Sequence, residues 1–268
     1  MHVVVEEELM RVRNNTYMSG GSSSSSSSGG NGSQQEWEAA WKRMLRMCFL
    51  RMDRMSSYTC DCGSLGYPCG CPPAYTLRLT GSTAVVAILT QESIIVANCG
   101  DSRAVLSRAG RAVPLSCDHK PDKLSERARI EAYGGKVIFA GVPRVGGVLA
   151  VSRALGDNCL KPYVIPEPEI SFIEREAEDE CLILASDGMW DVISNEMACQ
   201  VARQCLREEN PVRDHSSRPL VEGDDRGAIF SSRSASAAAV LTNLALTRLS
   251  RDNISVIVVD LKRNHAGR

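Results

Sequence analysis

Leu182–Val192, with the sequence LILASDGMWDV, joins a short apolar run to an acidic turn. Its first half predicts a strand at Cys181–Ala185, because a short apolar run bounded by turn residues is typical of a buried strand. Asp187-Gly188 then favours a turn directly after that strand. The pattern therefore places the carboxylate of Asp187 on a turn beside a rigid strand.

Two other aspartates share this local setting. Asp101 follows the apolar run Ser93–Cys99, and Asp252 precedes the run Ile254–Asp260. Carboxylates on turns at strand ends can converge at one edge of a sheet, and their oxygens are the hard ligands that Mg²⁺ and Mn²⁺ prefer. For any one of these aspartates, a plain turn-forming role is the better explanation. On the residues alone, both explanations stand.

The same pattern rules predict further elements along the chain. Expected strands lie at Thr83–Leu89, Ser93–Cys99, Arg103–Ser107, Lys136–Phe139, Cys181–Ala185 and Ile254–Asp260. Expected helices lie at Leu124–Tyr133, Glu196–Arg207 and Ala235–Leu249, with Gly134-Gly135 as a stop signal for the first. The turns at Gln91-Glu92 and Gly100-Asp101 favour an antiparallel meander of the first three strands. Because strands and helices do not alternate regularly, the sequence predicts an α+β protein with antiparallel sheets.

Three segments differ in composition from the rest of the chain. Residues 19–33 are almost entirely Ser and Gly and predict a flexible linker. Residues 58–75 form a Cys-rich loop, and residues 209–233 form a polar insertion.

A helix is expected to start at Ser33, which fits a capping box with Glu36. Large apolar residues then recur at three- and four-residue steps, which predicts one helix face packed on a core. They are Trp37, Trp41, Met44, Cys48, Met52 and Met55.

The composition is that of an ordinary globular protein. The chain has 268 residues, 43% hydrophobic and 24% charged, with a formal net charge of −1. This charge, without a basic cluster interleaved with aromatics, argues against nucleic-acid binding. The longest apolar runs are strand-sized, and the N-terminus has acids where a signal peptide needs positive charge. We expect no membrane association and a cytoplasmic or nuclear location.

Eleven cysteines are a high number for such a chain. Seven lie singly in apolar or helical surroundings and are expected to be small, reduced core residues. They are Cys48, Cys99, Cys117, Cys159, Cys181, Cys199 and Cys205. The other four, Cys60, Cys62, Cys69 and Cys71, form two C-x-C pairs. Structural zinc sites usually pair C-x₂-C with a distant second half, so a flexible loop is favoured and a zinc or redox site is the alternative.

The acidic turns belong to a longer series of segments in a fixed order. The segments are Gly81–Ala84 (GSTA), Asn98–Val105 (NCGDSRAV), Asp118–Pro121 (DHKP), Ala128–Ile130 with Gly134-Gly135 (ARI…GG), Val148–Asp157 (VLAVSRALGD), Leu182–Val192 (LILASDGMWDV) and Asp252–Leu261 (DNISVIVVDL). In this order and spacing, the chain from Gly81 to Leu261 resembles the protein phosphatase 2C family. Leu160–Glu169 (LKPYVIPEPE) is similar to the plant members that act in abscisic-acid signalling.

The resemblance implies a fold of two antiparallel sheets packed as a sandwich and flanked by helices. It implies two or more Mg²⁺ or Mn²⁺ ions, bridged by a water that attacks the phosphorus of phosphoserine or phosphothreonine. By the family pattern, Asp187 and Asp252 match ligands of the second metal. Asp101 matches a ligand, together with Asp187, of a weaker third metal. The implied function is metal-dependent dephosphorylation of proteins, in plant stress or hormone signalling.

The family pattern also contains an N-terminal third. That part carries an Arg that clamps the substrate phosphate and an Asp-Gly-His-Gly segment whose Asp bridges both metals. No Asp-Gly-His occurs in this sequence. We therefore expect residues 1–268 to form one phosphatase domain without its N-terminal strands. No catalytic residue is assigned, and the substrate-binding residues are unknown.

Two positions bear on partners and packing. Near Phe139-Ala140-Gly141 the abscisic-acid-linked members carry a Trp that contacts the hormone receptor, and this sequence has none there. We expect Phe139 to be a buried strand residue. The ring of Trp190, in the Ser-Asp-Gly-x-Trp-Asp motif, is expected to pack in the core.

Three hypotheses about function follow. The first is a phosphatase that acts on phosphorylated proteins. The second, raised by the absent bridging carboxylate, is a catalytically dead phosphatase-like protein that binds protein kinases or hormone receptors. The third is a zinc-binding module built on Cys60–Cys71.

Overall fold

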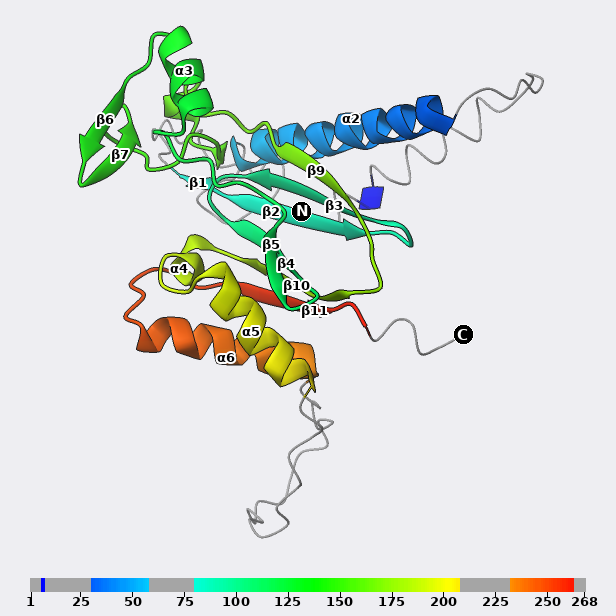
Figure 1. Cartoon of the computed structure of the whole chain (residues 1–268). Helices are drawn as coiled ribbons and strands as arrows, with labels where there is room; N and C mark the ends of the chain where they lie inside the picture. Colours follow the sequence, from blue (N-terminus) through cyan, green and yellow to red (C-terminus); the bar gives the residue numbers. More distant parts are fainter. Residues whose placement is uncertain (1–5, 8–29, 58–79, 208–231, 263–268) are drawn as a thin grey trace, which may run out of the picture. The chain divides into compact units, whose positions relative to one another are not determined.

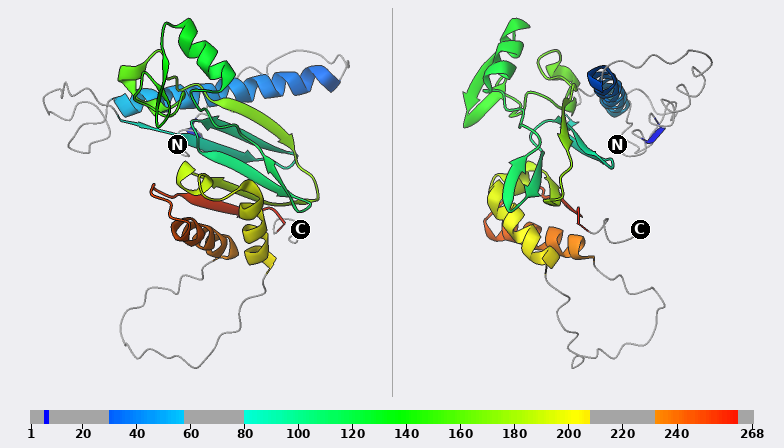
Figure 2. Two further views of the ribbon diagram at one scale, coloured as in Figure 1. Left: turned by 60° about the vertical axis from the view of Figure 1, so that its left-hand side comes forward. Right: turned by 45° about the vertical axis from the view of Figure 1, so that its right-hand side comes forward.

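The computed structural model describes residues 6–7, 30–57, 80–207 and 232–262. Its helices are α2 (Gly30–Ser57), α3 (Leu124–Ala132), α4 (Asp187–Trp190), α5 (Asn195–Arg207), α6 (Arg233–Thr247) and the 3₁₀ helix η1 (Asn158–Leu160). Its strands are β1 (Gly81–Ser82), β2 (Ala84–Leu89), β3 (Ser93–Cys99), β4 (Arg103–Arg108), β5 (Arg111–Pro114), β6 (Val137–Ala140), β7 (Val142–Val145), β8 (Leu155–Gly156), β9 (Glu169–Glu174), β10 (Asp179–Ala185) and β11 (Val256–Asp260). Figure 1 and Figure 2 show these elements.

The chain divides into two compact units, which are described separately. The first comprises residues 1–102 and 116–174, and the second residues 103–115 and 175–268. The Cys-rich loop and most of the predicted linker and polar insertion lie outside the described residues. The single-domain prediction stays a prediction.

A three-stranded antiparallel sheet, in the order β2-β3-β9, forms the centre of the first unit. β3 has the predicted bounds, and its residues 94–99 are buried, as expected for a continuous apolar run. It pairs with β2 in the register Ala84↔Cys99 and with β9 in the register Ser93↔Glu174.

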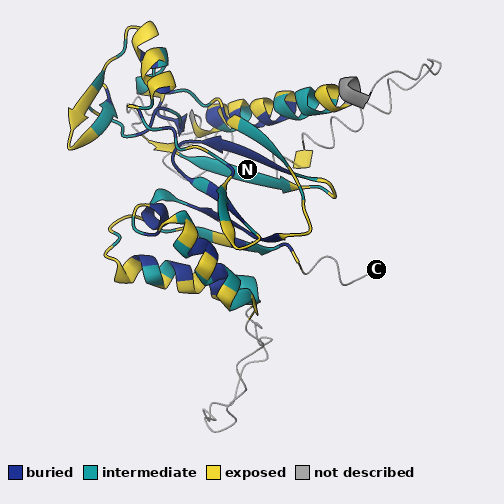
Figure 3. Ribbon diagram, in the orientation of Figure 1, coloured by how far each residue is buried: buried dark blue, intermediate teal, exposed yellow. Residues whose placement is uncertain are grey.

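Helix α2 packs its apolar stripe against this sheet. Met44, Leu45, Cys48 and Phe49 are buried together with sheet residues such as Ile95. Their three- and four-residue spacing lines one face of the helix, and the alternation of buried and exposed residues is visible in Figure 3. The predicted packing face is confirmed for Trp37, Trp41, Met44, Cys48 and Met52, which lie in this cluster, but it is wrong for Met55, which is 42% exposed. The predicted start at Ser33 is wrong, because the helix begins at Gly30.

The remainder of the first unit consists of α3 and the β6–β7 hairpin. Helix α3 ends at Ala132, and Gly134 follows with a φ of 82°, so the predicted Gly-Gly stop is confirmed. In the hairpin Phe139 pairs with Pro143. The prediction that Phe139 is buried is wrong: the residue is 76% exposed, because it lies on a two-stranded hairpin and no described part of the chain covers its ring.

The second unit is built on a four-stranded antiparallel sheet in the order β11-β10-β4-β5. β10 pairs with β11 in the register Ala185↔Val256 and with β4 in the register Ala185↔Arg103. The predicted meander is therefore wrong for its third strand. β4 leaves β3 at the Gly100 turn and joins a different sheet, where it pairs with β10.

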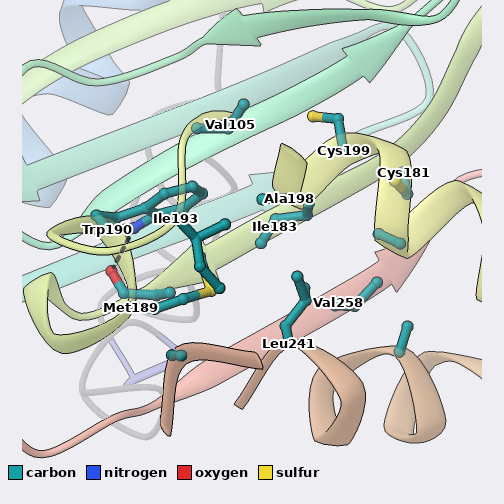
Figure 4. Close-up of a cluster of buried hydrophobic side chains, with 14 residues drawn as sticks. Val105, Cys181, Ile183, Met189, Trp190, Ile193, Ala198, Cys199, Leu241 and Val258 are labelled. Carbon is teal, nitrogen blue, oxygen red and sulfur yellow. Dashed lines mark hydrogen bonds between the residues drawn. The ribbon is translucent and has the colours of Figure 1, made fainter. Parts of the chain in front are cut away.

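Helices α5 and α6 cover one side of this sheet with an apolar core. The core contains Val105, Ile183, Met189, Ala198 and Leu241, among others (Figure 4). Trp190 belongs to the same cluster and is 6% exposed. Its indole N–H donates to the Ala185 carbonyl at 3.0 Å, so the prediction that Trp190 packs in the core is confirmed.

The cysteines within the described residues are free thiols. Cys48, Cys99, Cys181 and Cys199 are buried, as predicted, whereas Cys205 is half-buried. The prediction of core burial is wrong for Cys117, which is exposed on a loop, and for Cys159, which is exposed in η1. Burial raises the pKa of the Cys99 and Cys181 thiols to about 12 and that of Cys199 to about 11. These buried thiols are therefore neutral at physiological pH.

The prediction of an α+β fold with antiparallel sheets is confirmed by both units. Among the described residues, no helix has the length and apolarity that crossing a membrane requires.

Candidate metal site

Asp187 opens a one-turn helix directly after a fully buried strand. All seven residues of β10 are buried, and Ser186 follows in extended backbone as the cap of α4. Asp187 Oδ1 accepts a hydrogen bond from the Gly188 N–H at 2.9 Å. The predicted turn at the end of the strand is confirmed. We call residues 186–188 the Asp187 turn and residues 250–255 the Asp252 loop.

Hydrogen bonds join the Asp187 turn to the Asp252 loop. Ser186 Oγ donates to the Asn253 carbonyl at 3.0 Å and accepts from the Ser255 N–H at 3.0 Å. The Ser186 N–H also donates to the Ser255 carbonyl at 3.1 Å. On the other side, Ser250 Oγ donates to the Gly188 carbonyl at 2.6 Å. The two loops are therefore fixed against each other by their own serines and backbone.

Gly188 allows this close approach. A Cβ atom at this position would lie 2.4 Å from the Asn253 carbonyl oxygen and 3.1 Å from its carbon. Backbone atoms cannot yield as a flexible side chain can, so any larger residue would push the Asp252 loop away. The Asp-Gly pair thus serves the loop contact as well as the turn.

Asp252 lies beside the Asp187 turn because β10 and β11 are antiparallel neighbours. The register Ala185↔Val256 places the residues that follow β10 next to those that precede β11. Asp252 is exposed, and its Oδ1 accepts from the Asn253 N–H at 2.7 Å. The structure brings Asp187 and Asp252 to one edge of the sheet. That they bind a metal ion stays a prediction.

The donor set of this edge fits a hard cation that keeps much of its water. Mg²⁺ is usually bound by one or two carboxylates and retains several water ligands. A half-buried Asp187 and an exposed Asp252 leave room for such waters. Within the described ranges, no group of three or more His, Cys, Asp or Glu side chains is placed to hold an ion. The two aspartates therefore supply part of a coordination shell.

Asp101 belongs to the first unit and is described there. It follows Gly100, whose φ of 111° lies in a region that side chains other than glycine rarely adopt. The side chain of Asp101 is 6% exposed and forms an ion pair with Lys120, which is 40% exposed. The carboxylate of Asp101 thus already faces one cationic side chain.

His119, in the Asp-His-Lys-Pro segment, fastens the Gly100 turn. Its backbone N–H donates to the Gly100 carbonyl at 3.0 Å, and its Nδ1 lies 3.1 Å from the Gly100 nitrogen. The Nε2 atom lies 3.3 Å from Glu169 Oε2, which favours the tautomer with hydrogen on Nε2 and leaves Nδ1 as the acceptor. Burial, and then the charge of Arg153, lower the pKa of His119. A neutral imidazole therefore holds this turn.

Glu126 on α3 forms the centre of a buried charged network. Its carboxylate is 2% exposed and accepts from Arg129 Nη2 at 2.9 Å, Arg153 Nη2 at 2.6 Å and Ser152 Oγ at 2.8 Å. Burial alone would raise its pKa, but the bonds from Arg153, Arg129 and Ser152 outweigh burial and hold the pKa at about 2. Glu126 is thus an anion that joins α3 to the segment before β8.

Sequence reasoning found the aspartates but missed the residues that hold them. Ser186, Ser250 and Gly188 join the two loops of the sheet edge. Lys120 and Glu126 were also missed, although Lys120 lies within the quoted DHKP segment and the two arginines of the Glu126 network lie within ARI and VLAVSRALGD. The presence of charged residues inside otherwise apolar motifs was the available signal.

Solved structures with a similar fold include a serine-threonine phosphatase and a sex-determining protein. A serine-threonine phosphatase 2C from Toxoplasma gondii superposes with a TM-score of 0.65 at 21% identity, covering 88% of this chain and 72% of that one. A sex-determining protein of C. elegans superposes with a TM-score of 0.65 at 24% identity, covering 95% and 50%. At these identities the likeness establishes the α+β fold alone.

Sequence comparison then gives the family. The profile of protein phosphatase 2C matches residues 75–254. Probable protein phosphatase 2C 75 of Arabidopsis thaliana is 54% identical over 227 residues, covering 85% of this chain and 54% of the relative. Probable protein phosphatase 2C 8 of Oryza sativa subsp. japonica is 48% identical over 264 residues, covering 98% and 58%. The chain belongs to the protein phosphatase 2C family and spans little more than half the length of these relatives.

Proposed function

We propose that this chain contributes to a Mg²⁺- or Mn²⁺-dependent protein serine/threonine phosphatase, with Asp187 and Asp252 as ligands of one metal ion. The observation that carries the proposal is the pairing of the Asp187 turn with the Asp252 loop at one sheet edge. Membership of the protein phosphatase 2C family supports hydrolysis of phosphorylated proteins.

At the sheet edge, some residues position the two aspartates, and the aspartates themselves would bind the metal ion. When bound, the metal ions lower the pKa of a coordinated water and neutralise the phosphoryl oxygens. Asp187 is held by β10 and α4, and Asp252 by the serine hydrogen bonds of its loop. Because both carboxylates are fixed before an ion arrives, little reorganisation is needed on binding.

Asp101 is proposed as a ligand of a further ion. It follows the Gly100 turn, whose backbone is hydrogen-bonded to His119, and its carboxylate is paired with Lys120. The Lys120 ammonium would have to move aside for a metal ion to bind there directly. Asp101 would accordingly bind more weakly than an aspartate without a cationic neighbour.

The substrates that fit this proposal are proteins phosphorylated on serine or threonine. The similarity of Leu160–Glu169 to abscisic-acid-signalling members, and relatives from two plants, support a role in plant stress or hormone signalling. We propose a cytoplasmic or nuclear location for that role. Binding of protein kinases or receptors without catalysis is the alternative function.

Measuring hydrolysis by this chain distinguishes a phosphatase from a protein that binds kinases or receptors without catalysis. We expect the full chain to release phosphate from a phosphothreonine peptide in millimolar Mn²⁺ and to release none in EDTA. Asp187→Asn removes one ligand charge without changing the side-chain shape, and should lower the rate by about 100-fold or more. The measurement is phosphate release per minute at saturating peptide.

Asp122→Asn is the matched control, because Asp122 is exposed and lies outside the sheet edge. It should leave the rate unchanged. A folded chain that releases no phosphate at any Mn²⁺ concentration would refute catalysis and favour the binding function. Equal rates for the wild type and Asp187→Asn would refute the assignment of Asp187.

A further inference from the structure

A charged cavity lies in the second unit, at the opposite end of β10 from Asp187. It has a volume of about 290 Å³. Its lining consists of Glu180, Arg203, Leu206, Arg207, Arg233, Asp260 and Lys262, and we call it the Arg203 cavity. Glu180 lies near the start of β10 and Asp187 follows its end. At roughly 3.3 Å per strand residue, the cavity is about 20 Å from the proposed metal ligands.

The lining of the Arg203 cavity is positively charged. Four cationic side chains face two carboxylates, so two positive charges remain uncompensated within the described lining. Glu180 is already engaged: Ser107 Oγ donates to it at 2.8 Å, the Gly110 N–H at 3.1 Å and Arg207 Nη2 at 2.8 Å. Burial would raise the pKa of Glu180, but these hydrogen bonds outweigh it, so the pKa is lowered and the carboxylate is ionised.

Arg203 is a half-buried cation of the cavity. Its side chain is 23% exposed, and its Nε lies 3.7 Å from Glu180 Oε2, beyond hydrogen-bond distance. That buried Nε donates no hydrogen bond within the described part of the chain. A groove of about 340 Å³ on α5 has Arg203 and Arg207 in its lining as well, with Gln200 and Gln204 and no carboxylate. Two adjoining hollows thus share the same pair of guanidinium groups.

Arg233, in the first turn of α6, adds a further guanidinium group to the lining of the cavity. Its Nη1 donates to the Leu206 carbonyl at 3.0 Å, which fixes the start of α6 beside the end of α5. The cavity is therefore lined by residues of β10, α5, α6 and β11, with Lys262 just after β11. Guanidinium groups form paired, charge-assisted hydrogen bonds to phosphate oxygens and are the usual protein ligands for this group.

We propose that the Arg203 cavity binds a phosphate dianion, either free or carried by a phosphorylated side chain. Its volume lies at the lower end of small-molecule sites, which span about 300–1,000 Å³, so it suits a compact anion. This second anion site is separate from the aspartates and requires no metal ion. It does not depend on the chain being a phosphatase.

The test is a titration of the metal-free full chain in EDTA with inorganic phosphate, followed by NMR. We expect saturable shifts of the Nε–H signals of Arg203, Arg207 and Arg233. In the double variant Arg207→Gln/Lys262→Gln the affinity should fall at least about tenfold, because two cationic partners are removed. A second titration with a phosphoserine peptide and its unphosphorylated form identifies the source. Tighter binding of the phosphopeptide than of phosphate indicates a phosphoprotein, and the reverse indicates free phosphate.

The control variant Lys42→Gln/Arg127→Gln removes the same charge from exposed positions in the first unit. It should bind phosphate like the wild type. If phosphate shifts the arginine Nε–H signals no more than sodium chloride of matched ionic strength does, the proposal is overturned. The proposal would also be overturned if Arg207→Gln/Lys262→Gln bound phosphate with the same affinity as the wild type, provided thermal unfolding shows that variant to be folded. Because no hydrolysis occurs in EDTA, these results do not depend on the proposed catalytic function.

Discussion

Replacing Glu126 by Gln is expected to lower the free energy of unfolding by about 3–5 kcal/mol, the usual cost of breaking a buried ion pair by removing one partner. The carboxylate is 2% exposed and serves both Arg129 and Arg153. A neutral amide would leave two partly buried guanidinium groups without a counter-charge and would turn an N–H toward one of them. Urea unfolding at pH 7 measures the change.

The pH dependence of the stability difference between the wild type and Glu126→Gln gives a sharper test. The folded-state pKa of Glu126 is about 2, below the ordinary value of 4.5, so its stabilising effect is complete above pH 4.5 and is lost as the pH falls through about 2. The difference between the wild type and Glu126→Gln should therefore be constant from pH 8 to pH 5. On the same helix, Glu131→Gln breaks an exposed pair with Arg127 and should leave stability unchanged within error. Equal effects of the two substitutions would contradict the role given to the buried network.

Gly188→Val is expected to destabilise the chain by about 3 kcal/mol and to weaken metal binding. A Cβ would lie 2.4 Å from the Asn253 carbonyl oxygen, so the Asp252 loop must move away from the Asp187 turn. The smaller change Gly188→Ala should also destabilise, although Gly→Ala inside an ordinary helix stabilises by about 0.5–1 kcal/mol. Thermal unfolding and Mn²⁺ titration together measure the effect.

Gly134→Ala separates this steric effect from backbone strain. Nothing lies within 4 Å of a Cβ at Gly134, whose φ is +82°. That substitution should cost about 1–2 kcal/mol through the left-handed backbone alone and leave Mn²⁺ affinity unchanged. If Gly188→Ala were stabilising, or bound Mn²⁺ like the wild type, the close contact of the two loops would be refuted.

Local pattern sufficed for elements whose residues are uniformly buried. β3 and the Cys181–Ala185 part of β10 are short, mostly apolar runs bounded by turn residues, a pattern that predicts buried strands without knowledge of their partners. β9 was missed because Glu169–Glu174 mixes charged and apolar residues after a proline-rich stretch. The sheet to which β4 belongs was also not predictable. Its partner β10 lies some seventy residues away, and no local signal at Gly100 distinguishes a hairpin from a crossing to another sheet.

In the site, too, residues with a recognisable local sequence context could be predicted, whereas residues that act through contacts between distant segments could not. The position of Asp187 and Asp252 beside strands is a local feature, but their role as metal ligands was predicted from the family resemblance. Ser186, Ser250 and Gly188 act only through the contact between two separate loops, and small residues give no signal of it in a single sequence. Glu126 was not singled out from the sequence. It can be buried as an anion because Arg153, a residue distant in sequence, neutralises it.

The central claim is that the Asp187 turn and the Asp252 loop together bind a metal ion. Mn²⁺ titration of the full chain, followed by electron paramagnetic resonance of free Mn²⁺, tests it most directly. Even changes outside the first coordination sphere cost about 10- to 100-fold in affinity, so Asp187→Asn and Asp252→Asn should each lose at least about tenfold. Asp122→Asn should bind Mn²⁺ like the wild type. Unchanged affinity in both folded site variants would contradict the claim.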